Sequence, residues 1–318
     1  MTDHAIKTAS SARLCGNRCR SGFTLVEVLV VTVIIGILLA LVSAAVFPAL
    51  RSAKEFAITS EAGQLGMAIE AFKSHYGGGY PPADLAKPAS DGVDLLYNFV
   101  RETFPRFTEV PDPNDPGTML PLDKGLDNLR AYLETMKNED GDVEGVYIDT
   151  FDPGQSLVFW LVGFSNDPAD PFDGHVARMR GKNLEKAFYA FDPGRLGSRN
   201  EDGIWTVHYY PETVQSMNSD EAVATGGSLS FLYLDKRAYD KSYDPNGPGG
   251  GGSLPTFSAY QESGGTNPFY NPAGFQIISA GLDKQLGEGG ICSQPITGAD
   301  ADNITNFSGG TMADYINP

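Results

Sequence analysis

Residues 22–41 read GFTLVEVLVVTVIIGILLAL, and the apolar stretch continues to Leu50. Residues 28–50 carry no formal charge, and about 20 apolar residues are enough for a helix to cross a bilayer core. The sequence therefore predicts a membrane-spanning helix over residues 23–50. Glu27 lies inside this stretch, and a charge within a bilayer costs on the order of 2.5–3.5 kcal/mol on insertion scales. Glu27 thus needs either a charged partner or access to the membrane interface.

The segment before the apolar stretch is a basic leader, residues 1–22. Its charged residues are Asp3, Lys7, Arg13, Arg18 and Arg20, a balance of +3 in a chain whose net charge is −17, so residues 23–318 carry −20. Because positive flanks stay on the cytoplasmic side, we expect the leader to be cytoplasmic and the region after residue 50 to lie across the membrane. The acidic remainder makes nucleic acid an unexpected partner.

The run from Gly22 through Glu27 resembles the N-terminus of type IV pilins and of the pseudopilins of type II secretion systems. The resemblance implies that a prepilin peptidase cuts after Gly22 and that the new N-terminal residue, Phe23, becomes N-methylated. It also implies that Glu27 neutralises the N-terminal amine of a neighbouring subunit in a filament. One departure is that the proline expected near Ala44 stands instead at Pro48, which either bends the helix or marks the membrane exit.

A second helical pattern follows in residues 51–79. Apolar residues recur at spacings of three and four, the period of an amphipathic helix: Ile58, Ala62, Leu65, Ile69, Phe72 and Tyr76. Three glycines at 77–79 and prolines at 81 and 82 end it. Because a lone amphipathic helix is marginal, we expect the stem to pack on a small antiparallel sheet, giving an α+β fold.

The head, residues 80–318, shows short elements between many turn signals. Strands are predicted over residues 187–191, 203–210, 228–234 and 275–279, a helix near 125–136, and turns at Asp152-Pro153 and Asp192-Pro193. Residues 80–225 form a large loop-rich insertion between stem and sheet, and residues 244–253, DPNGPGGGGS, form a flexible loop.

Acidic residues gather near the C-terminus, in SAGLDKQLGEGG (279–290) and TGADADNITNFSGG (297–310). Carboxylate and carbonyl oxygens are the ligands that calcium prefers. Major pseudopilins have a similar calcium-binding ending, and this resemblance favours Asp283, Asp300 and Asp302 as ligands of a calcium cofactor. The alternative is an ordinary acidic surface loop whose Asp and Asn side chains only form turns.

No catalytic motif accompanies these segments. The four histidines lack metal-ligand spacing, and neither a nucleophile elbow nor a phosphate-binding loop occurs. Of three cysteines, two lie in the leader, and Cys292 has no basic neighbour to activate it, so we expect it to be buried and inert. Trp160 and Trp205 are expected in the core rather than at a ligand site. We expect no enzyme activity.

The sequence favours a pseudopilin-like structural subunit of a type II secretion-like system, single-pass in a bacterial inner membrane with its head in the periplasm or at the cell surface. Its implied partners are other pilin or pseudopilin subunits, the prepilin peptidase and an inner-membrane assembly platform. Leu25, Val28, Leu29, Ile34 and Leu38 would make the filament core. Two alternatives stay open: a minor type IV pilin with an adhesive or ligand-binding head, and a membrane-anchored extracytoplasmic domain that uses the leader only for sorting.

Overall fold

The computed structural model describes residues 23–317 except for internal gaps at 84–94, 123–125, 138–139, 142, 144, 147–150, 202–203, 213–228, 241, 244–255, 263–267 and 293. The chain divides into two compact units at the boundary between Leu50 and Arg51. The first unit contains the apolar half of the long N-terminal helix. The second contains the amphipathic half of that helix and the head.

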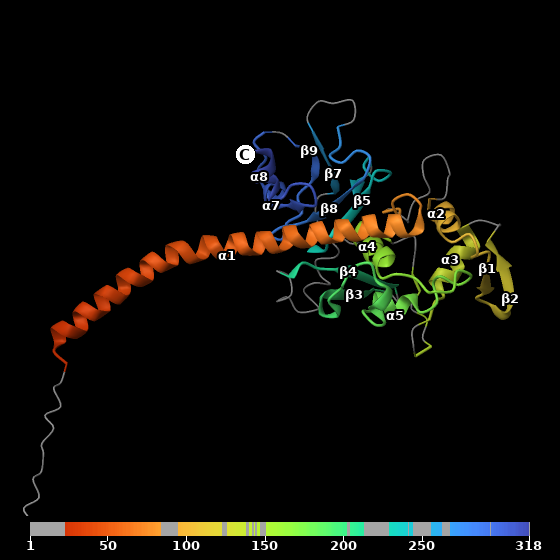
Figure 1. The fold of residues 1–318 in the computed structure, drawn as a ribbon, viewed down its shortest axis with the longest axis horizontal. Coiled ribbons are helices and arrows are strands. Elements are labelled where there is room, and N and C mark those ends of the chain that lie inside the picture. Colours follow the sequence, from red (N-terminus) through yellow and green to blue (C-terminus); the bar gives the residue numbers. More distant parts are fainter. Residues whose placement is uncertain are drawn as a thin grey trace, which may run out of the picture. The chain divides into compact units, whose positions relative to one another are not determined.

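Helix α1 (Leu25–Tyr76) is a single element of 52 residues that includes Pro48 (Figure 1). It ends where the sequence predicts. Gly77 takes a left-handed φ of 68°, and its N–H donates to the carbonyl of Lys73 at 3.0 Å. A glycine adopts this conformation without the steric cost that a side chain would impose, so Gly77 closes the last turn.

The outer half of α1 buries one face in the head. Ile58, Ala62, Leu65, Ile69 and Phe72 are each no more than 1% exposed, which confirms the predicted stripe. Burying a side chain of this size stabilises the fold by about 1.5–3 kcal/mol. The burial of this face therefore makes the outer half of α1 part of the head's hydrophobic core.

A cluster of aromatic rings surrounds the end of that stripe. The Phe72 ring lies 5.8 Å from Trp160 and 5.3 Å from Phe188, centroid to centroid, in edge-to-face arrangements. Such pairs add about 0.5–1.5 kcal/mol beyond the area they bury. Trp160 is fully buried, as expected for a core residue. The side chain of Trp205 lies outside the described part of the structure.

The sheet that the stem was expected to need is antiparallel and three-stranded, with the order β10 (Ile304–Thr305), β8 (Phe275–Ser279), β5 (Leu232–Asp235). Every residue of the central strand β8 is buried. At Gly66 of α1 a Cβ would lie 3.7 Å from the Phe275 ring, so helix and sheet are in close contact. The α+β prediction is confirmed.

Other short elements complete the head. Two hairpins are β1 (Glu109–Asp112) with β2 (Asp115–Pro121), and β3 (Leu196–Glu201) with β4 (Ile204–Tyr209). A mixed sheet has the order β6 (Ser242–Tyr243), β7 (Phe257–Glu262), β9 (Gly289–Cys292), with β7 and β9 parallel. The helices are α2 (Leu95–Thr103), α3 (Leu126–Glu134), α4 (Pro153–Leu161), α5 (His175–Met179), α7 (Ala299–Asp302) and α8 (Met312–Ile316), with 3₁₀ turns at Leu184–Lys186 and Pro193–Arg195.

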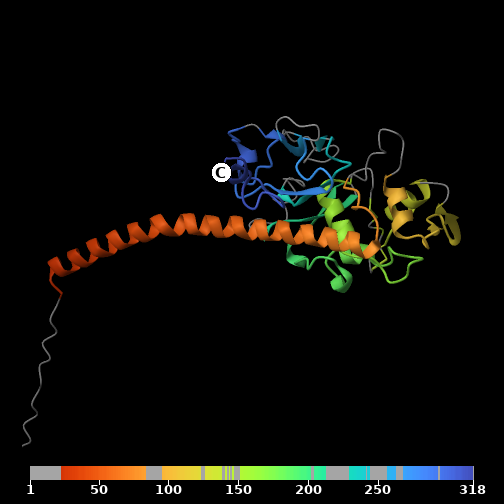
Figure 2. The same ribbon diagram turned by 45° about the horizontal axis from the view of Figure 1, so that its top comes forward.

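Within the head, the strands lie on different sides of the outer half of α1. Figures 1 and 2 both show the C-terminal strands on one side of this helix and the β3–β4 hairpin on another. Helices α2 and α3 and the β1–β2 hairpin gather beyond its C-terminal end. The predicted insertion between stem and sheet thus contributes elements that lie around the outer half of α1. Helix α3 confirms the helix predicted near 125–136.

Two local predictions were wrong. The predicted strand at residues 187–191 is irregular, because its aromatic side chains pack on other elements: Phe188 on Phe72, and Phe191 on Tyr209. The predicted turn at Asp152-Pro153 is instead the start of α4, where Asp152 is the N-cap and Pro153 begins the helix.

The remaining strand predictions are confirmed with shifted ends. β8 has the predicted bounds, β4 lies within the predicted 203–210, and β5 begins at Leu232 instead of residue 228. Residues 244–253, predicted as a flexible loop, lie outside the described residues.

Candidate functional site

The start of α1 is a reciprocal cap formed by Thr24 and Glu27. The Thr24 N–H and hydroxyl donate to Glu27 Oε2 at 2.8 and 2.9 Å, and the Glu27 N–H donates back to Thr24 Oγ1 at 3.2 Å. This is a capping box, in which a Thr and a Glu three residues apart satisfy N–H groups that have no partner in the first turn. These hydrogen bonds hold the Glu27 carboxylate at the helix N-terminus, against Thr24.

The signal for this cap was present in the sequence as Thr24-Leu-Val-Glu27 but was not used. From the sequence, Glu27 was expected to need a charged partner or access to the membrane interface, and the resemblance implied the amine of a neighbouring subunit as that partner. The cap shows that Glu27 has a local partner in the single chain, which accounts for its place at the start of the apolar segment. Gly22, the predicted residue before the cleavage point, lies outside the described residues, and Phe23 is 85% exposed.

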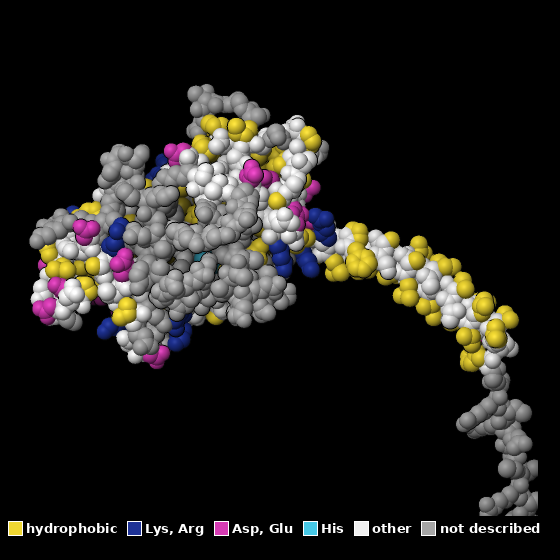
Figure 3. Space-filling model, turned by 180° about the vertical axis from the view of Figure 1, so that it is seen from behind, with side chains coloured by type: hydrophobic (Ala, Val, Ile, Leu, Met, Phe, Trp, Pro, Cys, Tyr) yellow, Lys and Arg dark blue, Asp and Glu magenta, His cyan; other side chains and the backbone are white. Residues whose placement is uncertain are grey.

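Apolar side chains cover the face of the first unit's helix that Figure 3 shows. Leu25, Val28, Leu29, Ile34 and Leu38 are each more than half exposed. Among the helices that the structure describes, α1 is the one long and apolar enough to cross a membrane. An apolar surface of this kind requires lipid or other protein surfaces around it. Together with the leader, this helix indicates membrane anchoring.

The outer half of α1 is joined to the head through Glu61. Its Oε1 accepts hydrogen bonds from the hydroxyls of Tyr189 and Tyr209, both at 3.0 Å, and forms an ion pair with Arg195. The side chains of Arg195 and Glu61 are only 10% and 11% exposed. Burial opposes the charge on Arg195, but hydrogen bonding and attraction to Glu61 outweigh it and raise the pKa of Arg195.

Arg195 is itself fixed by further contacts. Its Nε and Nη2 both donate to the carbonyl of Tyr210, at 2.9 and 2.6 Å, and its guanidinium lies 4.6 Å from the centre of the Tyr209 ring. The burial of Glu61 was not predicted. The spacing of apolar residues shows which face of the helix is buried, but it does not show that a carboxylate lies on that face. Glu61 ties the stem to the β3–β4 region.

A second buried polar pair lies at the start of α4. His208 Nε2 is 2.7 Å from Asp152 Oδ2, and Asp152 Oδ1 accepts the N–H groups of Gly154 and Gln155 at 2.7 and 2.8 Å. Burial would raise the pKa of Asp152, but His208 and these two N–H groups lower it below its usual value. Asp152 and His208 are both buried, at 8% and 4% exposure, so the pair caps a helix inside the core.

Asp302 closes the C-terminal loop onto the stem. Its Oδ2 accepts the N–H groups of Leu282 and Asp283 at 2.6 and 2.8 Å, and its Oδ1 pairs with Arg51 Nη2 at 2.7 Å. The Arg51 side chain is 64% exposed, and an exposed ion pair contributes about 0–1 kcal/mol. The two backbone hydrogen bonds therefore hold the loop more firmly than the ion pair.

Asp300 makes a matching set of contacts in the same loop. Its Oδ1 accepts the Gly289 N–H and the Tyr260 hydroxyl, both at 2.9 Å, and its Oδ2 accepts the Glu288 N–H at 3.2 Å. Burial raises the pKa of Tyr260 well above its usual value, so this hydroxyl stays protonated as a donor. Asn303 also donates to the Tyr260 oxygen, at 2.6 Å.

The side-chain oxygens of the predicted calcium ligands thus accept hydrogen bonds from N–H and O–H groups of the protein. Asp283 Oδ1 accepts the Gln285 N–H at 2.8 Å in a local turn. Within the part of the chain that the structure describes, no three His, Cys, Asp or Glu side chains are grouped as a metal site. These carboxylates accept hydrogen bonds from the protein, and calcium binding by Asp283, Asp300 and Asp302 stays a prediction.

Cys292 lies at the end of β9 and is 6% exposed. Burial, with the Asp300 carboxylate nearby, raises its thiol pKa to about 11. A thiol in this state is a poor nucleophile near neutral pH. The expectation that Cys292 is buried is confirmed.

Comparison with known proteins identifies the N-terminal segment. Residues 17–43 match the family model of the prokaryotic N-terminal methylation motif, a match that includes Gly22, Phe23 and Glu27. No curated protein and no solved structure matches the chain. The motif and the long apolar helix fit the leader of a type IV pilin or pseudopilin and support a type IV pilin-like substrate of prepilin peptidase. The resemblance seen in the sequence is confirmed for this segment.

Proposed function

We propose that this chain is a pseudopilin-like structural subunit, cut between Gly22 and Phe23 and assembled into the filament of a type II secretion-like system. The observation that supports the proposal is the match of residues 17–43 to the methylation motif, a stretch in which Glu27 is the fifth residue after the proposed cleavage point. The exposed apolar surface of α1 supports it, because such a surface can pass from lipid to the helices of neighbouring subunits without meeting water.

Assembly uses the charge on Glu27. In the membrane, the helix of one subunit carries a new amino terminus at Phe23 after cleavage, and this amine is positive at neutral pH. An unpaired charge among packed apolar helices is costly, so the amine of an incoming subunit is drawn to the Glu27 carboxylate of its neighbour. The Thr24 hydrogen bonds hold that carboxylate at the helix end, where it can be reached.

Membrane orientation follows from the basic leader. The leader and its cleavage point face the cytoplasm, where prepilin peptidase and the assembly platform act, and the acidic head lies outside the inner membrane. The head stiffens the outer half of α1, because the Glu61–Arg195 ion pair and the buried apolar face hold that part of the helix against the head. Each subunit then adds to the same face of the one before, an open arrangement that gives a filament.

The proposal is tested by producing the full chain in a bacterium with an active type II secretion system and separating sheared filaments from membranes. We expect the mature chain in the filament fraction when the peptidase is active and only in membranes when it is absent. Recovery of the cleaved chain only as membrane-anchored monomer would support the anchored-domain alternative. A chain present at one copy per filament end, instead of along the shaft, would support a minor pilin.

A further inference from the structure

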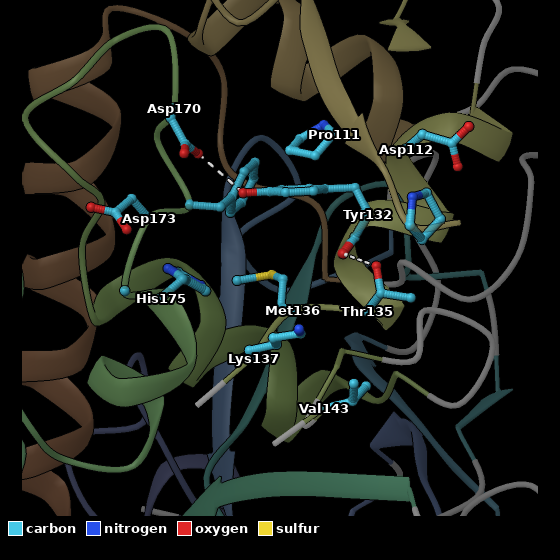
Figure 4. Close-up of a pocket in the computed structure, with 13 residues that line it drawn as sticks. Pro111, Asp112, Tyr132, Thr135, Met136, Lys137, Val143, Asp170, Asp173 and His175 are labelled. Carbon is cyan, nitrogen blue, oxygen red and sulfur yellow. Dashed lines mark hydrogen bonds between the residues drawn. The ribbon is translucent and has the colours of Figure 1, made fainter. Parts of the chain in front are cut away.

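No further inference is drawn: the strongest candidate, the cavity of about 460 Å³ in the head between the end of β1, the C-terminal end of α3 and the loop that leads into α5 (Figure 4), carries nothing, because His175 and Phe172 are fully buried and the acidic side chains around Asp170 that remain are a cluster beside which nothing in the described part of the structure points to a ligand.

Discussion

The Glu27 carboxylate accepts two hydrogen bonds from Thr24, one from its N–H at 2.8 Å and one from its hydroxyl at 2.9 Å, at the first turn of a 52-residue helix. The same residue lies within the methylation motif matched at residues 17–43 and is the fifth residue of the proposed mature chain. Glu27 therefore has two partners in succession: Thr24 within the single chain, and the amine of a neighbouring subunit in the proposed filament.

These two partners are separable by mutation. Glu27→Gln keeps an oxygen that can accept from Thr24 but removes the charge, so we expect normal cleavage and loss of the chain from sheared filaments. Thr24→Ala removes the cap at a cost of about 1 kcal/mol and keeps the charge, so filaments should still form. Filaments at the unmodified level in Glu27→Gln would show that the charge is not used in assembly.

Removing one partner of the buried Glu61–Arg195 pair should destabilise the head. Glu61→Leu leaves Arg195 and two tyrosine hydroxyls buried without their acceptor, and breaking a buried pair in this way costs about 3–5 kcal/mol. The matched control is Glu70→Leu on the same helix, where the side chain is 53% exposed and its ion pair with Lys73 contributes about 1 kcal/mol or less. Thermal unfolding followed by circular dichroism measures both. Similar losses in the two variants would contradict the assignment.

Asp152 gives the head a defined sensitivity to acid. Because its folded-state pKa is lowered, its contribution to stability is present above the ordinary carboxyl value of about 3.9 and is lost as the pH falls through the folded-state pKa. We expect the melting temperature of Asp152→Asn to fall less steeply between pH 5 and pH 2 than that of the unmodified chain. Parallel pH profiles in the two proteins would show that Asp152 is not responsible.

The C-terminal loop makes a clear prediction about calcium. Because Asp300 and Asp302 already accept N–H and O–H groups of the protein, we expect chelation with EDTA to leave the melting temperature unchanged to within about a degree, and Asp302→Asn to lower it. A fall of several degrees in EDTA that calcium reverses, and that Asp283→Asn abolishes, would instead establish the calcium site predicted from the sequence.

Much of the stem could be predicted because its signals are long and periodic. Twenty-three uncharged residues and a stripe at spacings of three and four leave few other structures, and Gly77 marks the end. Helix α4 could not be predicted in this way, since all nine of its residues are buried and its sequence has no polar face to give a period. Asp152 followed by Pro153 is the pattern of a helix N-cap, but the same pattern is equally typical of a turn.

The polar contacts of the head could not be predicted for a related reason. Glu61 and Arg195 lie more than a hundred residues apart, and no local pattern links them. The aromatic run at 187–191 has the composition of a strand, but tertiary packing against Phe72 and Tyr209 decides its conformation.

The central claim, that the chain enters the prepilin pathway, is tested most directly by intact mass and N-terminal sequencing of the protein from membranes of a host with prepilin peptidase. The account predicts a chain that begins at Phe23 and carries one added methyl group on its amino terminus. A chain that keeps Met1 through Gly22 while the host's own prepilins are cleaved would contradict it, and residues 23–50 would then be a membrane anchor alone.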